Sequence, residues 1–419
     1  MKATTYIDKK QNDLYALGDL LFKTPELGYK EFETKRILTD FFTSNGLEVK
    51  DLGFETAFSV TIGKGKPHIG LVAELDGIPT LGHKYANKKD MNAAHSCGHS
   101  TQCAIMAYAI VALKNQGIDK GTVTLFFTPG EEYTDIAYRK KLIREKKLKY
   151  IGGKSNLLAS GAFDDIDMFI HLHTMSEGKY DYSLGSMLTG FIHKTITFKG
   201  KASHAAVAPE KGINALDEFV SFYNELNELK NSFSEEDKTI IHGIVIEGGQ
   251  SVNSVPERVV YECYVRSKDS DVLIDTGKKV DAIARKAARK YGGKVRIETM
   301  PGYLPLIQSK ELNEVIEKEM LRYSKNIRGS HVSMAAGDVG DIGSLKPLVQ
   351  FGYSGFKGTC HSKDLCVGDY SKAYLEPCKI VCGSVNALLK DDKKVKEIIE
   401  NFKPLMNKKE YMDYLNNKR

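Results

Sequence analysis

Short apolar segments alternate with amphipathic segments along the first part of the chain. The apolar segments have the length of buried strands, and the amphipathic segments have the periodicity of helices. Strands are predicted at residues 58–62, 68–73, 123–127 and 168–172, and helices at about 9–22, 30–45 and 97–114. Strands that alternate with helices indicate an α/β sheet covered by helices on both faces.

The middle of the chain has a different pattern. Alternating strands are predicted at 191–198, 240–246, 259–266 and 295–300, and helices at 215–229 and 272–291. The resulting order β-α-β-β-α-β is that of a ferredoxin-like sandwich.

The earlier pattern returns after residue 305, with a helix at 310–323, a strand at 347–351 and a helix at 370–389. We therefore predict one α/β domain that is split in sequence by an insertion. The predicted parts are a first catalytic segment (1–186), an inserted lid or dimerisation domain (187–303), a second catalytic segment (304–390) and a Lys-rich extension (391–419). The extension is expected to be a solvated helix.

Composition narrows the class of protein. A length of 419 residues predicts two or three domains, and the net charge of +6 is too small to indicate nucleic-acid binding. No apolar run approaches the roughly 20 residues that span a membrane, and the N-terminus shows no secretory signal. Seven cysteines, an odd number without a regular framework, favour a reducing compartment, so a cytoplasmic location is expected.

Polar residues that can bind metal follow three of the predicted strands. Asp76 ends the second strand, Glu131 and Glu132 follow the third, and His171 and His173 end the fourth. Because ligands bind at the carboxyl ends of strands in open α/β sheets, we expect these side chains to lie at one edge.

Two further segments add a thiol and imidazoles. Cys97 and His99 open the long apolar helix, and His361 lies in a Gly-flanked loop late in the chain. Thiolate, imidazole and carboxylate together indicate a transition metal rather than magnesium or calcium. In the pair Glu131-Glu132, one carboxylate can bind metal while its neighbour activates the bound water.

The chain resembles the metal-dependent amidohydrolase and aminoacylase family, which includes hippurate hydrolase, plant auxin-conjugate hydrolases and aminobenzoyl-glutamate hydrolase. The resemblance spans about residues 14–389 and is closest to the cysteine-containing branch. It rests on ordered motifs at 73–79, 94–99, 128–132, 198–206, 253–256 and 336–341. It implies a mixed central sheet flanked by helices, as in metallo-exopeptidases, together with the inserted domain.

The resemblance also implies a dinuclear centre of two divalent metal ions, which could be zinc, manganese, cobalt or nickel. Its ligands would be Cys97, His99, Glu132, His173 and His361, with the Cys97 thiolate bridging the ions.

The remaining roles follow from the same resemblance. Glu131 would be the general base, and Asp76 would orient a ligand. His204 of the inserted domain would stabilise the oxyanion with help from Asn253, and because this histidine often reaches a partner subunit in relatives, a homodimer is implied. Arg266 would hold a substrate carboxylate, although a strand-end salt bridge is an equal alternative.

Two departures from the family pattern leave alternatives open. His171 lies two residues before His173 and would face the same side of a strand, so the two could exchange roles. A basic segment at 133–150 is shorter in hippurate-type relatives. It either shapes the pocket for an anionic acyl group or carboxylate, or is a plain surface helix.

The predicted activity is hydrolysis of the linear amide bond of an N-acyl or N-aroyl amino acid. Dipeptidase or carboxypeptidase activity at the same centre is the alternative, since one activated water serves both bonds. A non-catalytic metal-binding relative is disfavoured because Glu131 is present, and thiol redox chemistry at Cys97 is disfavoured because no Cys-x-x-Cys pair accompanies it.

Overall fold

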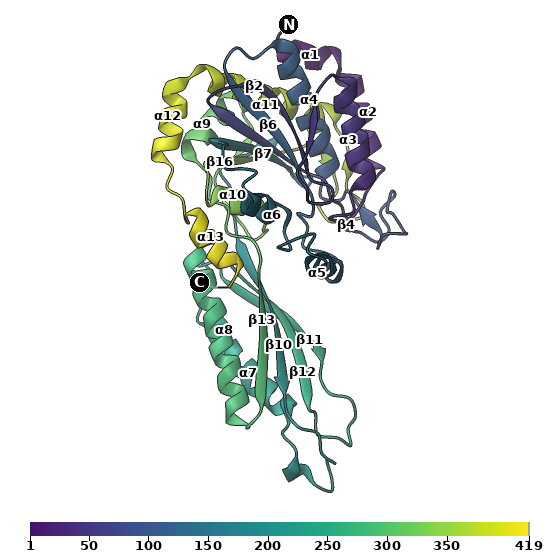
Figure 1. Ribbon diagram of the computed structural model, residues 1–419, viewed down its shortest axis with the longest axis vertical. Helices are drawn as coiled ribbons and strands as arrows, with labels where there is room; N and C mark the ends of the chain where they lie inside the picture. Colours follow the sequence, from purple (N-terminus) through teal and green to yellow (C-terminus); the bar gives the residue numbers. More distant parts are fainter. Residues whose placement is uncertain (418–419) are drawn as a thin grey trace. The chain divides into compact units, whose positions relative to one another are not determined.

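The computed structural model describes residues 1–417, which fold as two compact units (Figure 1). The first unit consists of Met1–Met187, Ile307–His331 and Asp341–Leu405. The second consists of Leu188–Leu306, Val332–Gly340 and the segment that begins at Met406. No helix of the described residues is both long enough and apolar enough to cross a membrane.

The first unit is built on an eight-stranded sheet in the order β1-β2-β6-β3-β7-β16-β8-β14. The four central strands β6, β3, β7 and β16 are parallel, whereas β2 runs antiparallel to β6. The mixed central sheet predicted from the sequence is therefore confirmed. The strands are β1 Val49–Asp51, β2 Phe58–Lys64, β3 His68–Glu74, β6 Gly121–Thr128, β7 Met168–Thr174, β8 Tyr182–Ser183, β14 Ile327–Arg328 and β16 Leu348–Tyr353.

Helix α4 (His99–Gln116) is the central helix of this unit. Residues 99–113 are all buried. From Cys103 to Leu113 the helix itself carries mostly small or apolar side chains on every side, as is typical of a buried helix. It packs against α1, α2 and α11 as well as β3. The other helices of the unit are α1 Ala3–Lys9, α2 Gln11–Phe22, α3 Phe32–Ser44, α5 Ile136–Arg144, α6 Gly153–Ser160, α9 Lys310–Met320, the π-helix η2 Ser371–Leu375, α11 Glu376–Lys390 and α12 Asp392–Asn401.

The second unit contains a four-stranded antiparallel sheet in the order β11-β12-β10-β13, with two long helices along it (Figure 1). Asn214 and Asp269 cap the two helices with their side chains. This arrangement confirms the ferredoxin-like insertion. Its elements are β10 Gly190–Lys199, η1 Pro209–Lys211, α7 Ala215–Asn231, β11 Ile240–Glu247, β12 Arg258–Ser267, α8 Ser270–Lys290 and β13 Lys294–Pro301.

Short elements complete the chain. Strand β4 (Ile78–Pro79) pairs with β5 (Ala93–Ala94), β9 (Met187–Leu188) with β15 (Val332–Ser333), and β17 (Phe356–Lys357) with β18 (Cys366–Val367). Helix α10 covers Val339–Gly343.

The Lys-rich extension differs from the single solvated helix expected from its charge. It forms two helices, α12 and α13 (Lys408–Leu415), and each buries one face. The buried face of α12 includes Val395 and Ile398, and that of α13 includes Tyr411 and Tyr414. Helix α12 packs on α9 and α11 in the first unit, and α13 packs on β13 in the second. The apolar positions, although outnumbered by lysines, recur at helical spacing and decide the packing.

Candidate metal centre

The carboxyl ends of β3 and β6 bring the first carboxylates together. The two strands are paired in parallel up to Glu74 and Thr128, so Asp76 lies beside the turn that follows β6. The Asp76 carboxylate accepts hydrogen bonds from the backbone N–H groups of Glu131 at 3.1 Å and Glu132 at 2.9 Å. Asp76 therefore fixes the backbone of the Glu131-Glu132 pair.

Gly98 places Cys97 and His99 at the start of α4. Its φ of +82° is a left-handed conformation, and a Cβ there would lie 1.9 Å from Thr174 Oγ1. His99 Nδ1 lies 2.7 Å from the backbone oxygen of Asp76, which leaves Nε2 facing Glu131 Oε2 at 3.9 Å and Glu74 Oε2 at 3.3 Å. This Nε2 is buried and has no hydrogen-bond partner among the described residues.

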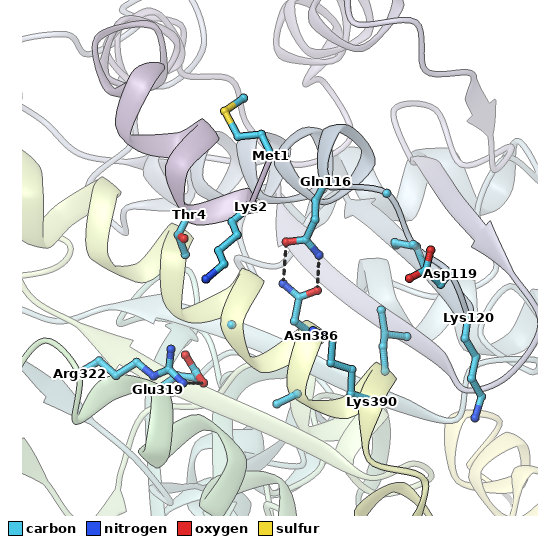
Figure 2. Close-up of a pocket in the computed structure, with 15 residues that line it drawn as sticks. Met1, Lys2, Thr4, Gln116, Asp119, Lys120, Glu319, Arg322, Asn386 and Lys390 are labelled. Carbon is cyan, nitrogen blue, oxygen red and sulfur yellow. Dashed lines mark hydrogen bonds and ion pairs between the residues drawn. The ribbon is translucent and has the colours of Figure 1, made fainter.

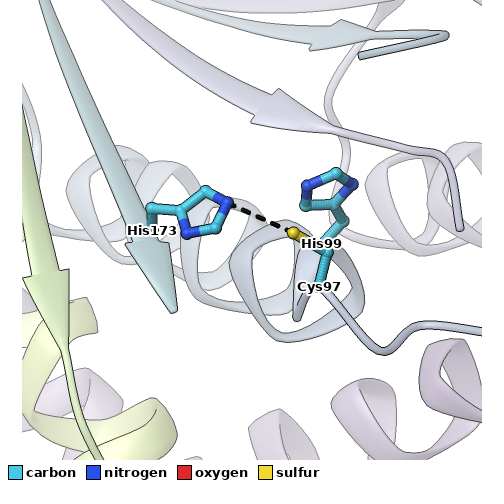
Figure 3. A group of neighbouring side chains, drawn as sticks. All are labelled: Cys97, His99 and His173. Carbon is cyan, nitrogen blue, oxygen red and sulfur yellow. Dashed lines mark hydrogen bonds between the residues drawn. The ribbon is translucent and has the colours of Figure 1, made fainter. Parts of the chain in front are cut away.

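Cys97 connects two histidines from distant parts of the chain. Its sulfur lies 3.5 Å from His173 Nε2, and Figure 3 shows the His173 ring directed at that sulfur with His99 beside it. The sulfur is also 3.2 Å from His361 Nε2. The backbone N–H of His361 donates to the oxygen of Ser96, which holds the late loop against the cysteine segment.

These side chains form three overlapping groups, and within each group the ligand atoms lie within 4.8 Å of one another. Cys97 and His99 each belong to two of these groups, as does Glu132. The groups are Cys97, His99 and His173; Cys97, Glu132 and His361; and His99, Glu131 and Glu132. The structure thus brings together all five predicted ligands and the predicted base.

The electrostatics of the cluster suit a cation. Burial raises the pKa of the Cys97 thiol well above its usual value, and Glu132 and Glu131 raise it further. Burial also lowers the pKa of His173 to about 4, which keeps the imidazole neutral, as a metal ligand must be. A divalent ion would offset the repulsion between the thiolate and the carboxylates, so these residues fit a transition-metal site.

Glu132 and His361 form a charged pair at the edge of the cluster. Burial raises the pKa of Glu132, but the hydrogen bond and charge of His361, together with His99 and Cys97, outweigh burial and lower it overall. The hydrogen bond to Glu132, which lies 3.3 Å away, raises the pKa of His361.

The structure distinguishes the environments of His171 and His173. His171 is fully buried, with Nε2 3.0 Å from Gln102 Nε2 and Nδ1 3.1 Å from Gln350 Oε1. His173 is the histidine that lies against Cys97. The geometry favours His173 as the ligand and gives His171 a place in the polar network behind it.

That network contains a charged pair that sequence reasoning did not identify. Lys154 of α6 is fully buried, and its Nζ lies 2.6 Å from Glu74 Oε1. Glu74 also lies 3.3 Å from His171 Nε2. The position of Glu74 at the end of β3 was a signal for it, but nothing in the local sequence marks Lys154 as buried.

The other predicted site residues belong to the second unit. His204 and Asn253 are exposed on neighbouring loops, where the N–H of Ala205 donates to the backbone oxygen of Asn253. Arg266 donates from Nη1 to the oxygen of Met334 at 2.9 Å, and its guanidinium lies over the rings of Phe191 and Tyr264. None of these contacts of Arg266 is with a carboxylate, which the alternative interpretation as a strand-end salt bridge would require. The roles of the three residues stay predictions.

A separate surface pocket of about 750 Å³ in the first unit contains none of the predicted site residues (Figure 2). Four of its polar side chains form two pairs within the lining. Gln116 and Asn386 exchange two hydrogen bonds, and Arg322 lies 3.1 Å from Glu319.

Comparisons with known proteins agree with the fold. Residues 187–292 match the family described as "Peptidase dimerisation domain" (M20_dimer). The chain is 26% identical to the Xaa-Arg dipeptidase of Homo sapiens, over 71% of this chain and 65% of that protein. It is 26% identical to the N-acetyl-L-cysteine deacetylase of Bacillus subtilis (strain 168), over 73% and 71%. The chain thus spans less than two thirds of the human dipeptidase.

Solved structures share the fold. A dinuclear metal binding peptidase of the M20 family from Bacillus subtilis superposes with a TM-score of 0.69 at 17% identity, covering 91% of this chain and 99% of that one. The aminobenzoyl-glutamate utilization protein from Klebsiella pneumoniae gives a TM-score of 0.67 at 13% identity, with coverage of 92% and 98%.

The fold and the matches define an α/β protein of the metallo-exopeptidase type with an inserted dimerisation domain. The resemblance to the metal-dependent amidohydrolase and aminoacylase family is confirmed: the inserted domain matches the M20 dimerisation domain, and the chain is similar to an N-acetyl-L-cysteine deacetylase and, in fold, to an M20 peptidase.

Proposed function

We propose that this protein is a metal-dependent hydrolase that cleaves the linear amide bond of an N-acyl or N-aroyl amino acid. The observation that carries the proposal is the convergence of Cys97, His99, Glu131, Glu132, His173 and His361 at one edge of the central sheet. Relatives described as deacetylase and dipeptidase support hydrolysis of amide-like bonds.

In this proposal, Cys97, His99, Glu132, His173 and His361 would hold two divalent ions, and Cys97 would serve as a ligand of both. The overlap of two ligand groups at Cys97 supports the shared position. The bound ions would lower the pKa of a water molecule and polarise the substrate carbonyl. Asp76 keeps His99 oriented through the contacts at Nδ1, so that Nε2 remains available as a ligand.

Glu131 is the general base. It takes a proton from the attacking water and later gives the proton to the leaving nitrogen. Two features support this role: its side chain is buried beside His99 Nε2, and its backbone is held by Asp76. Its carboxylate belongs to the same group as His99 and Glu132, so it would be within reach of a water bound there.

The remaining roles in this proposal belong to residues of the second unit. We assign His204 and Asn253 to the oxyanion and Arg266 to the substrate carboxylate, and we propose a cytoplasmic homodimer. The dimer is supported by the match to a dimerisation domain and by the edge strand β11, on which Ile244 and Ile246 are 57% and 53% exposed. Exposed apolar side chains on an unpaired edge favour association.

Dipeptidase activity is the second candidate, because the Xaa-Arg dipeptidase of Homo sapiens is among the matched relatives. A panel of N-acetyl, N-benzoyl and dipeptide substrates with added zinc, manganese, cobalt or nickel separates the two. N-acyl amino acids are expected to give the higher kcat/KM.

The same panel tests the roles of the two carboxylates. Glu131→Gln should keep its metal and lose activity on the order of a hundredfold or more, since the base is removed. Glu132→Gln should instead weaken metal retention. If both variants keep full turnover, the assignment of roles is wrong.

A further inference from the structure

The basic segment between Glu132 and Gly152 carries one arginine that differs from its other charged residues. The segment forms α5, in which Arg139 is fully buried, whereas Lys141 and Arg144 are exposed. Burying a guanidinium is costly unless its donors are satisfied, so the contacts of Arg139 indicate what the helix does.

The guanidinium of Arg139 bonds the backbone of the turn that carries the two glutamates. Nη1 donates to the oxygen of Gly130 at 2.8 Å and to the oxygen of Ile151 at 3.3 Å. Nη2 donates to the oxygen of Glu132. The guanidinium also lies over the ring of Tyr29, 5.4 Å from its centroid. One side chain thus binds both ends of the Gly130–Glu132 turn.

Two other buried side chains bind the N–H groups of this turn. Glu31 Oε1 accepts from the N–H of Gly130 at 2.9 Å, and Asp76 accepts from both glutamates. The turn itself has an unusual conformation, since Gly130 has a φ of +63° and a Cβ there would lie 2.6 Å from Tyr29. Its shape therefore depends on side chains outside it, and Arg139 binds its carbonyl groups.

We infer that Arg139 is a positioning residue, which holds the Gly130–Glu132 turn so that the carboxylates of Glu131 and Glu132 face the metal centre. This inference rests on the proposed function of that centre. It also gives the basic segment a role other than a plain surface helix, since α5 is the element that delivers the guanidinium.

The geometry requires arginine rather than lysine. Two separate nitrogens of a planar fork bind two carbonyl groups of the turn, whereas a lysine amine is a single point charge. The surroundings are shaped to the fork as well: a Cβ at Gly28 would lie 2.5 Å from Nη2. Arg139→Lys therefore keeps the charge and loses the two-point attachment.

The test compares Arg139→Lys with Arg144→Lys, a matched change at an exposed site of the same helix. Cobalt(II) is titrated into the metal-free proteins, and the thiolate-to-cobalt charge-transfer band reports the affinity. We expect Arg139→Lys to bind Co²⁺ roughly 10–100-fold more weakly, as for other groups that orient ligands. We also expect kcat to fall at least about tenfold while KM changes less than about twofold, because the loss is in the reacting groups. Arg144→Lys should match the wild type.

Wild-type Co²⁺ affinity in a folded Arg139→Lys variant would overturn the inference while leaving the proposed function intact. If Arg139→Lys does not fold, Arg139→Gln, which keeps one donor, replaces it in the same titration. Failure of both to fold would assign Arg139 to the stability of α5 and overturn the positioning role. If wild type and Arg144→Lys bind no Co²⁺ and hydrolyse no substrate, the proposed function fails and the inference fails with it.

Discussion

Replacing Lys154 by methionine removes the charged partner of a buried carboxylate and keeps a side chain of similar length. Lys154 is fully buried and Glu74 is 1% exposed, with 2.6 Å between Nζ and Oε1. Burial raises the pKa of Glu74, but Lys154, His171 and His99 outweigh burial and lower it well below its usual range. The carboxylate is therefore ionised in the folded protein, and the variant leaves its charge without the lysine.

The expected loss of stability is large. At 2.6 Å and an effective dielectric constant of about 20, the two charges attract by about 6 kcal/mol, and the cost of burying them offsets part of this. Removing one partner of a buried pair typically costs about 3–5 kcal/mol, so the free energy of unfolding should fall by that amount. Urea denaturation of the metal-free protein at pH 7, followed by circular dichroism, measures it.

Two controls make the test specific. Lys120→Met breaks an exposed pair with Asp392 and should cost less than about 1 kcal/mol. The double variant Glu74→Gln/Lys154→Met removes both charges and should recover most of the loss. Because a carboxylate with a lowered pKa stabilises the fold above its unfolded pKa, the gap between wild type and Lys154→Met should close as the solution is acidified. A loss below about 1 kcal/mol for Lys154→Met at pH 7 would refute the reasoning.

Three further predictions concern other parts of the chain. Burial raises the pKa of Glu218 to about 7, above the usual carboxyl value, so folding is favoured by the neutral carboxyl below about pH 4 and this contribution is lost progressively as pH rises to about 7. Glu218→Gln should therefore match wild type near pH 4 and be more stable by about 1–2 kcal/mol at pH 8, by thermal melting at both pH values. Cys97→Ser should remove the charge-transfer band of the cobalt protein and weaken metal retention, measured by dialysis and elemental analysis, and an unchanged band would contradict a ligand role. Ile244→Lys places a charge on the exposed edge strand β11 and should shift the protein toward monomer in analytical ultracentrifugation; a dimer as tight as wild type would locate the interface elsewhere.

The sequence was most informative where chemistry and local pattern coincide. Asp76, Glu131 and Glu132 follow apolar strands and His173 lies near the end of one, and parallel neighbours place such residues at one edge by geometry alone. The helix that begins at His99 could be recognised from its apolar run. The convergence of these side chains therefore follows from features that a single sequence contains.

The sequence was least informative where long-range contacts decide the outcome. His171 and His173 look equivalent on a strand, and they differ because Gln102 and Gln350 bond the first while Cys97 lies against the second. Likewise, nothing in a Lys-rich segment marks Arg139 as the buried cation while Lys141 and Arg144 are exposed. Such assignments depend on partners far away in the chain, which only the folded structure brings into contact.

The measurement that tests the central claim most directly is anomalous X-ray diffraction from crystals of the protein loaded with zinc or cobalt. We predict two anomalous peaks about 3.5–4 Å apart, with the Cys97 sulfur between them and Glu131 beside the shared water. Peaks only at other places on the protein, or none in metal-saturated crystals, would contradict the proposal that these six side chains form a dinuclear hydrolytic centre.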